Sequence, residues 1–139
     1  MLDEIFDQEL SQLLQKESSA PVCEAGTPLS EARNKMQQNR SGCIVVLDGK
    51  KTAGIFTERD FLLKVQAENL SGSNPVSEFM VHNPVTVNPD TTIKEALVAM
   101  RVGNFRSLVV AGPGGDYMGV VTMKDLAFYI TDVAGFQNE

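Results

Sequence analysis

Two short segments of the sequence combine residue types that could bind a ligand. Residues 54–60 read GIFTERD and residues 119–125 read GVVTMKD. A strand that runs into a helix N-terminus directs backbone N–H groups toward one point, where an anion can bind. A nearby carboxylate can accept both hydroxyls of a ribose. One interpretation is therefore nucleotide binding by Thr57 with Asp60 and by Thr122 with Asp125.

The same residues also fit a purely structural role. A threonine at a helix N-cap and an acidic residue three positions later exchange hydrogen bonds in a capping box, which is a common helix start. For one such turn taken alone, this is the preferred interpretation. The two roles can coexist, because a carboxylate has more acceptor positions than one cap requires.

The chain repeats itself internally. Residues 27–36 (TPLSEARNKM) align with residues 91–100 (TTIKEALVAM) at an offset of 64 positions (91 − 27), and CIVV at 43–46 then aligns with SLVV at 107–110. The first glycines of the GIFTERD and GVVTMKD segments lie 65 positions apart (119 − 54), which one inserted loop residue explains. Self-similarity of this length indicates two copies of one supersecondary unit.

Each copy predicts the same order of elements: strand, helix, strand, strand, helix. Apolar residues at helical spacing follow helix-start signals at Thr27 and Thr91. The β-branched runs 44–47 and 108–110 predict strands buried on both faces, and residues 85–89 alternate like a strand. The sequence therefore predicts an α+β fold of two pseudo-symmetric β-α-β-β-α repeats. They should pack together, because a unit of about sixty residues buries too little apolar surface alone.

The predicted division is an N-terminal helix at residues 1–19, repeat 1 at residues 20–72 and repeat 2 at residues 73–139. The opening helix is amphipathic, and its apolar stripe consists of Leu2, Ile5, Phe6, Leu10, Leu13 and Leu14. We expect this stripe to cover the core or to contact a second copy of the chain.

Composition excludes several classes of function. The net charge of −6 disfavours attraction to nucleic acid or to an anionic membrane surface, because both require a basic footprint. The longest apolar runs are far shorter than the ~20 residues that cross a bilayer, and the acidic N-terminus is unlike a signal peptide. We therefore predict a cytoplasmic protein. Cys23 and Cys43 match no disulfide framework or zinc pattern and are predicted to be buried.

Candidates for catalysis are sparse. His82 is the only histidine in the sequence, and no acid–base partner accompanies it. GKKT at residues 49–52 matches only the end of a phosphate-binding P-loop, because the first glycine is missing and Lys51 stands where Ser or Thr belongs. We predict no catalytic residues, no metal ligands and no enzymatic activity.

The motifs together resemble the cystathionine beta-synthase (CBS) domain, which occurs as tandem pairs called Bateman modules. The resemblance covers about residues 21–133. It is based on VSEFM at residues 76–80, NPVTVNPDTTIKEA at 83–96, the central CIVVLD and SLVV, and both copies of G-h-h-T-x-x-D, where h is hydrophobic. None of these motifs alone is specific for the family, but their order, duplication and spacing together make a strong match.

The resemblance implies a regulatory module that binds adenosine-containing ligands in clefts between the repeats and requires no cofactor. The implied ligands are AMP, ADP, ATP or S-adenosylmethionine. By the same resemblance, Asp60 and Asp125 would hold ribose hydroxyls, and Thr57 and Thr122 would contact ribose or phosphate.

The resemblance also implies contacts outside the two T-x-x-D turns. Backbone around the first strand of the second copy, at Val85 and Val87, would hold the adenine. In the family, a basic residue just before the central strand often contacts a phosphate, and Arg106 matches that position.

The first copy departs from this pattern. Gly42 stands where the second copy has Arg106, and residues 21–26 (PVCEAG) lack the clean alternation of their counterpart. We therefore favour the site around Asp125 and keep Asp60 as a second candidate.

A different class of function remains open at the level of sequence. Family resemblance implies a homodimer formed through helices, and the apolar residues available for it are Phe61, Leu62, Phe128 and Ile130. Each of these could equally belong to the core. The alternative to a nucleotide sensor is thus a dimerisation or protein-docking module with vestigial sites. In either case, the sequence predicts that the chain acts on a separate effector protein of unknown identity.

Overall fold

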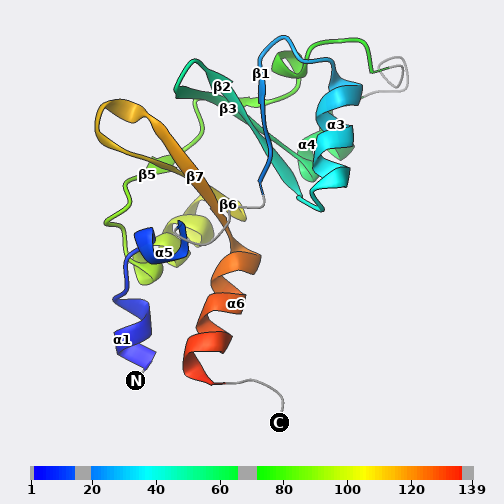
Figure 1. Ribbon diagram of the computed structural model, residues 1–139. Coiled ribbons are helices and arrows are strands. Elements are labelled where there is room, and N and C mark those ends of the chain that lie inside the picture. Colours follow the sequence, from blue (N-terminus) through cyan, green and yellow to red (C-terminus); the bar gives the residue numbers. More distant parts are fainter. Residues whose placement is uncertain (1, 15–19, 66–71, 136–139) are drawn as a thin grey trace. The chain divides into compact units, whose positions relative to one another are not determined.

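The computed structural model describes residues 2–14, 20–65 and 72–135 and confirms a mixed α+β fold (Figure 1). The chain forms two compact units. The first unit contains residues 19–84 together with 115–117, and the second unit contains the rest. Each unit has its own sheet and its own hydrophobic core.

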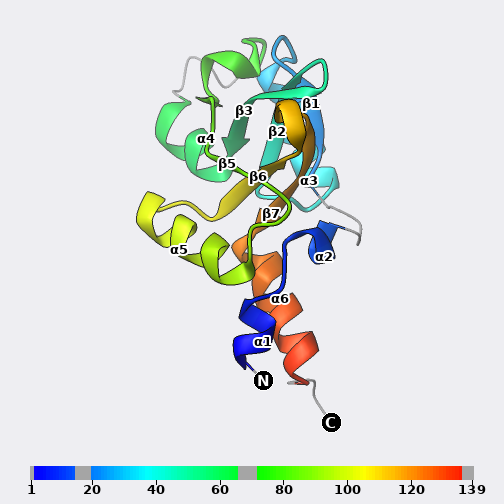
Figure 2. The same ribbon diagram turned by 90° about the vertical axis from the view of Figure 1, so that its left-hand side faces the viewer.

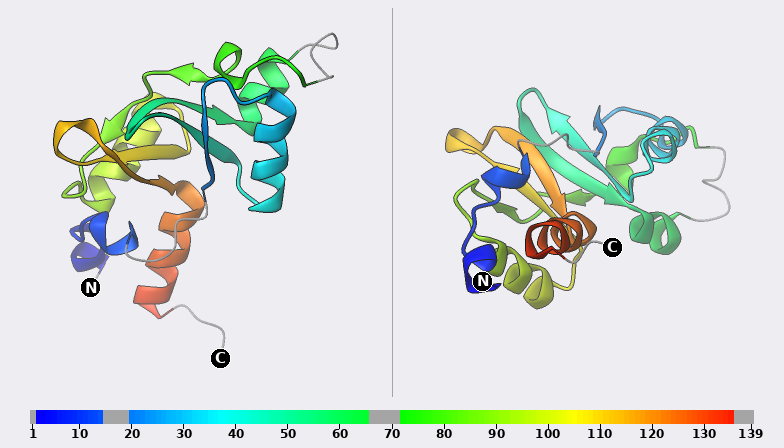
Figure 3. Two further views of the ribbon diagram at one scale, coloured as in Figure 1. Left: turned by 45° about the horizontal axis from the view of Figure 1, so that its top comes forward. Right: turned by 60° about the horizontal axis from the view of Figure 1, so that its bottom comes forward.

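The first unit has a four-stranded sheet in the order β1-β2-β3-β4. Its strands are β1 (Val22–Glu24), β2 (Cys43–Asp48), β3 (Lys51–Thr57) and β4 (Val81–His82). Its helices are α3 (Leu29–Gln38), α4 (Glu58–Lys64) and the 3-10 turn η2 (Val76–Glu78). β1 runs parallel to β2, whereas the pairs β2–β3 and β3–β4 are antiparallel. Figure 3 shows α3 and α4 beside this sheet.

The core of the first unit forms between the sheet and its helices. Ile44 and Val46 alternate along β2 and pack in one cluster with Leu29 and Met36 of α3. Val45, which lies between them on the strand, is also fully buried. The prediction that this strand is covered on both faces is therefore confirmed.

The second unit has a three-stranded sheet in the order β5-β6-β7. Its strands are β5 (Thr86–Val87), β6 (Ser107–Ala111) and β7 (Tyr117–Thr122), with the turn η3 (Pro113–Gly115) between the last two. Its helices are α1 (Leu2–Phe6), α2 (Ser11–Leu14), α5 (Ile93–Gly103) and α6 (Met123–Ala134). Figure 2 shows α1 beside α6, which it contacts. Within the described ranges, every helix is too short or too polar to cross a bilayer.

The strand register confirms the internal repeat. In the first unit, Val22 of β1 is paired with Val45 of β2. In the second unit, Thr86 of β5 is paired with Val109 of β6, which is the same pair displaced by 64 positions. The first copy therefore forms its opening parallel strand, although its sequence lacks the alternation seen in the second.

The N-terminal helix is present, but it consists of two short segments, α1 and α2. Between them the chain leaves the helical path, because Glu9 forms a β-bridge with Thr92 and the Leu10 N–H donates to the Thr91 carbonyl at 2.8 Å. Ile5 and Leu10 are buried in the core of the second unit, so core cover is confirmed. Residues 15–19 of the predicted helix lie outside the described residues.

Candidate functional site

The GVVTMKD segment joins strand β7 to helix α6 in the second unit. Thr122 is the N-cap of α6, and its N–H donates to Oδ2 of Asp125 at 2.9 Å. In return, the Asp125 N–H donates to Oγ1 of Thr122 at 3.0 Å. The predicted capping box is therefore confirmed in this turn.

Sheet topology brings other predicted residues to the same edge. β5 and β6 are parallel, so Val85 before β5 and Arg106 before β6 lie at one edge of the sheet. β7 neighbours β6 after a short turn and runs in the opposite direction, so Thr122 reaches this edge as well. A bond of 2.8 Å from the Met123 N–H to the Arg106 carbonyl joins the two segments directly.

The side chains at this edge differ in exposure. Val85 is 56% exposed, whereas Val87 is partly buried against the core of the second unit. Arg106 is exposed and Asp125 is partly exposed. Together these residues place an apolar surface, a cation and a carboxylate at one edge of the sheet. That combination matches the parts of a nucleotide.

The GIFTERD segment forms the equivalent turn of the first unit. The Thr57 N–H and hydroxyl both donate to Oδ2 of Asp60, at 3.0 and 3.1 Å, and the Asp60 N–H donates to Oγ1 of Thr57 at 3.2 Å. Oδ1 of Asp60 forms an ion pair with Lys64 at 3.1 Å. Asp60 is only 6% exposed.

Sequence reasoning missed the ion pair between Lys64 and Asp60. The signal was available, because residues four positions apart on a helix face each other. The pair leaves the two turns unequal. Asp60 accepts two hydrogen bonds and forms one ion pair, whereas Asp125 accepts a hydrogen bond from the Thr122 N–H.

Several backbone N–H groups at the starts of α4 and α6 already donate to partners within the chain. In α6, the Met123 and Asp125 N–H groups already donate to the Arg106 carbonyl and to Thr122. In α4, the Glu58 N–H donates to the Gly42 carbonyl at 3.0 Å. These three N–H groups are satisfied within the chain and are therefore not free to bind a phosphate.

A third capping box shows that the T-x-x-acid pattern alone does not define a ligand site. At the start of α5, the Thr92 N–H donates to Oε1 of Glu95 at 3.0 Å, and the Glu95 N–H donates to Oγ1 of Thr92 at 3.1 Å. The hydrogen bond from the Thr92 backbone holds the pKa of Glu95 below its usual value, and the Thr92 hydroxyl adds to the effect. The distinguishing feature of the Asp125 turn is therefore its position beside β5 and β6.

Burial affects the pKa of two further side chains, Cys23 and Tyr117. Both cysteines are buried, as predicted, and burial raises the pKa of the Cys23 thiol. Burial also raises the pKa of Tyr117 to about 12. A ring nitrogen of His82 lies 3.0 Å from the Ser77 carbonyl. Within the described segments, His, Cys, Asp and Glu side chains form no group of three or more that could hold a metal ion.

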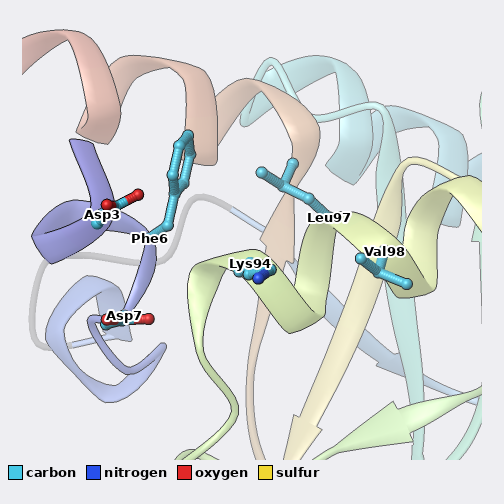
Figure 4. Close-up of a pocket in the computed structure, with 6 residues that line it drawn as sticks. All are labelled: Asp3, Phe6, Asp7, Lys94, Leu97 and Val98. Atoms are coloured by element: carbon cyan, nitrogen blue, oxygen red, sulfur yellow. The ribbon is translucent and has the colours of Figure 1, made fainter.

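A pocket of about 540 Å³ lies away from the predicted residues, between α1 and α5 of the second unit (Figure 4). Its lining consists of Asp3, Phe6, Asp7, Lys94, Leu97 and Val98. Two carboxylates against one ammonium give this pocket a net negative charge, which opposes a phosphate ligand. We therefore do not assign the nucleotide site to it.

Comparison with known proteins agrees with the repeated architecture. A CBS domain family model matches residues 13–67 and 76–132. The CBS domain-containing protein CBSCBSPB1 of Arabidopsis thaliana is 36% identical over 135 residues, which are 96% of this chain. The chain spans only 25% of the length of that relative.

Solved structures share the fold over nearly the whole chain. The CBS domain protein PAE2072 from Pyrobaculum aerophilum, complexed with AMP, has a TM-score of 0.78 and 26% sequence identity. The comparison covers 92% of this chain and 99% of that one. The CBS-domain containing protein ATU1752 from Agrobacterium tumefaciens has a TM-score of 0.77 at 25% identity, covering 87% and 98% of the two chains. This chain therefore belongs to the CBS domain family and contains two tandem copies of the domain.

Proposed function

We propose that the chain is a regulatory module that binds an adenosine nucleotide at the sheet edge around Asp125. The observation that supports this most is the convergence of Val85, Arg106 and the Thr122–Asp125 turn at one edge of the β5-β6-β7 sheet. A relative of the same fold, PAE2072, was solved in complex with AMP.

Each part of a nucleotide has a candidate partner at this edge. The Asp125 carboxylate retains acceptor positions for the two ribose hydroxyls, because a carboxylate offers about four. Thr122 would contact the ribose or phosphate. The Arg106 guanidinium would pair with a phosphate, and the backbone around Val85 and Val87 would hold the adenine.

The proposal also covers which ligands the module binds and how it regulates another protein. The candidate ligands are AMP, ADP, ATP and S-adenosylmethionine, with Thr57 and Asp60 kept as a second candidate position. The module has no catalytic role, forms a homodimer and acts in the cytoplasm on a separate effector protein. The ligand does regulatory work only if it binds one arrangement of the protein better than another.

A second candidate function is a dimerisation or docking module whose ligand sites are vestigial. It is favoured by exposed apolar side chains on the helix that follows each T-x-x-D turn. Leu62 on α4 is 79% exposed, and Phe128 on α6 is 60% exposed. By contrast, Phe61 and Ile130 pack partly against the two cores.

Thermal unfolding with each of the four ligands tests the proposal. A ligand at about a hundred times its dissociation constant stabilises the native state by about 2.7 kcal/mol, which raises Tm by several degrees. We expect such a shift in the wild type and its loss in Asp125→Asn. The matched control is Glu95→Gln, which makes the same carboxylate-to-amide change in the capping box of α5 and should keep the shift.

Two outcomes would contradict the proposal. The absence of a shift with all four ligands would favour the docking module. A shift that persists unchanged in Asp125→Asn would show that the nucleotide binds elsewhere.

A further inference from the structure

The side chain of Lys64 forms an ion pair with one oxygen of the Asp60 carboxylate. Both residues lie on α4, four positions apart, and Lys64 Nζ is 3.1 Å from Asp60 Oδ1. The Lys64 side chain is 41% exposed, whereas that of Asp60 is only 8% exposed. The ammonium therefore neutralises a carboxylate that is largely shielded from water.

The remaining oxygen of Asp60 is also in use. Oδ2 accepts the N–H and the hydroxyl of Thr57 at 3.0 and 3.1 Å. With Lys64 on Oδ1, three of the roughly four acceptor positions of the carboxylate are filled. A ribose diol needs two acceptor positions, so Asp60 cannot bind one without losing a present partner.

The second unit lacks this arrangement. The residue that corresponds to Lys64 at the 65-residue offset is Tyr129, whose hydroxyl donates to Oε1 of Gln8. Within the described part of the chain, no lysine or arginine forms an ion pair with Asp125. The two aspartates therefore occupy the same position of the motif, but only Asp60 has a positively charged side chain paired with it in the described part of the chain.

We infer that Lys64 is an internal competitor that prevents Asp60 from accepting a ribose, so that the chain contains one operative nucleoside site. This inference depends on the proposed function, because it concerns the selectivity of the same kind of site. A ligand at Asp60 would exchange an ammonium for neutral hydroxyls, and hydrogen bonds between two charged groups are stronger than those with a neutral donor. Removal of the ammonium should open the second site.

Calorimetric titration with AMP tests this inference. We expect the wild type to bind one AMP per chain and Lys64→Met to bind a second, with affinity at the Asp60 site raised about tenfold or more. Lys64→Arg is the matched control: it keeps the ion pair and should behave like the wild type. The double variant Lys64→Met with Asp60→Asn should return to one AMP per chain.

Amide chemical shifts measured by NMR locate the second AMP molecule, and they do not depend on the heat of binding that calorimetry measures. AMP should move the Thr57 and Asp60 amide signals in Lys64→Met but not in the wild type. The inference is overturned if the wild type binds two AMP molecules with equal affinity, or if Lys64→Met still binds one. If AMP binds to none of the proteins, the proposed function itself fails. Binding by Lys64→Met alone would support the role of Lys64 but contradict the Asp125 site.

Discussion

Asp60 and Asp125 occupy the same position of a repeated motif, and their different burial explains why they bind different partners. A carboxylate that is withdrawn from water must be satisfied by protein donors, because an unpaired buried charge is costly. The chain satisfies Asp60 with Thr57 and Lys64. Asp125 is more exposed, so water can complete its hydrogen bonding and a ligand can displace that water.

Gly54 gives a test of packing at the scale of one residue. An added Cβ would lie 2.4 Å from Sδ of Met80 and 2.8 Å from the carbonyl oxygen of Val81. The carbonyl belongs to the paired strand β4 and cannot move freely. We expect Gly54→Ala to destabilise the protein by about 1–3 kcal/mol in urea unfolding.

Gly26→Ala is the control for this prediction. Nothing lies within 4 Å of a Cβ at Gly26, so the substitution should be neutral or stabilise by about 0.4–1 kcal/mol. Equal stability of the two variants would contradict the close approach of β3 and β4 at Gly54.

The local parts of the site could be predicted from sequence. The hydrogen bonds of Thr57 with Asp60 and of Thr122 with Asp125 span three residues, so spacing alone indicates them. The donation from Met123 to the Arg106 carbonyl could not be predicted from spacing, since it joins two segments through the sheet.

At the scale of elements, the start of α5 should depend on pH. The folded-state pKa of Glu95 lies below its usual value of 4.5 because Thr92 donates to its carboxylate. The ionised side chain therefore stabilises the helix at neutral pH, and this stabilisation is lost as the pH falls through the folded-state pKa. Thr92→Ala keeps the backbone N–H but removes the hydroxyl that also donates to Glu95, so it should cost about 1 kcal/mol at neutral pH and less in acid.

Urea unfolding across the acidic range measures this dependence. The stability difference between the wild type and Thr92→Ala should be constant above the usual pKa of Glu95 and shrink below it. Glu95→Gln removes the titrating group, so in that background the difference should not vary with pH. A difference that is unchanged down to acid unfolding would contradict the role of Glu95.

Regular elements followed their sequence patterns more closely than short ones. The apolar spacing of α3 and α5 and the β-branched runs of β2 and β6 predicted those elements. The two-residue strand β4 had no such signal, because its pairing with β3 alone defines it. The interruption between α1 and α2 likewise results from a bridge to a residue far along the chain.

At the scale of the whole molecule, the two copies share one architecture but differ in their sites. The parallel strand pairs keep the same register in both units, so duplication preserved the backbone framework. Arg106 and the partly exposed Asp125 are specific to the second unit, and the Lys64 ion pair is specific to the first. The repeat could be predicted from the sequence. The burial of Asp60 could not, because it depends on how the rest of the unit packs around this residue.

A crystal structure of the protein grown with AMP is the most direct test of the central claim. We predict that the two ribose hydroxyl oxygens lie about 3 Å from the Asp125 carboxylate, with the adenine beside Val85 and the phosphate near Arg106. AMP bound in the pocket that Asp3 and Asp7 line, or at Asp60 with Asp125 left in contact with water alone, would contradict the claim.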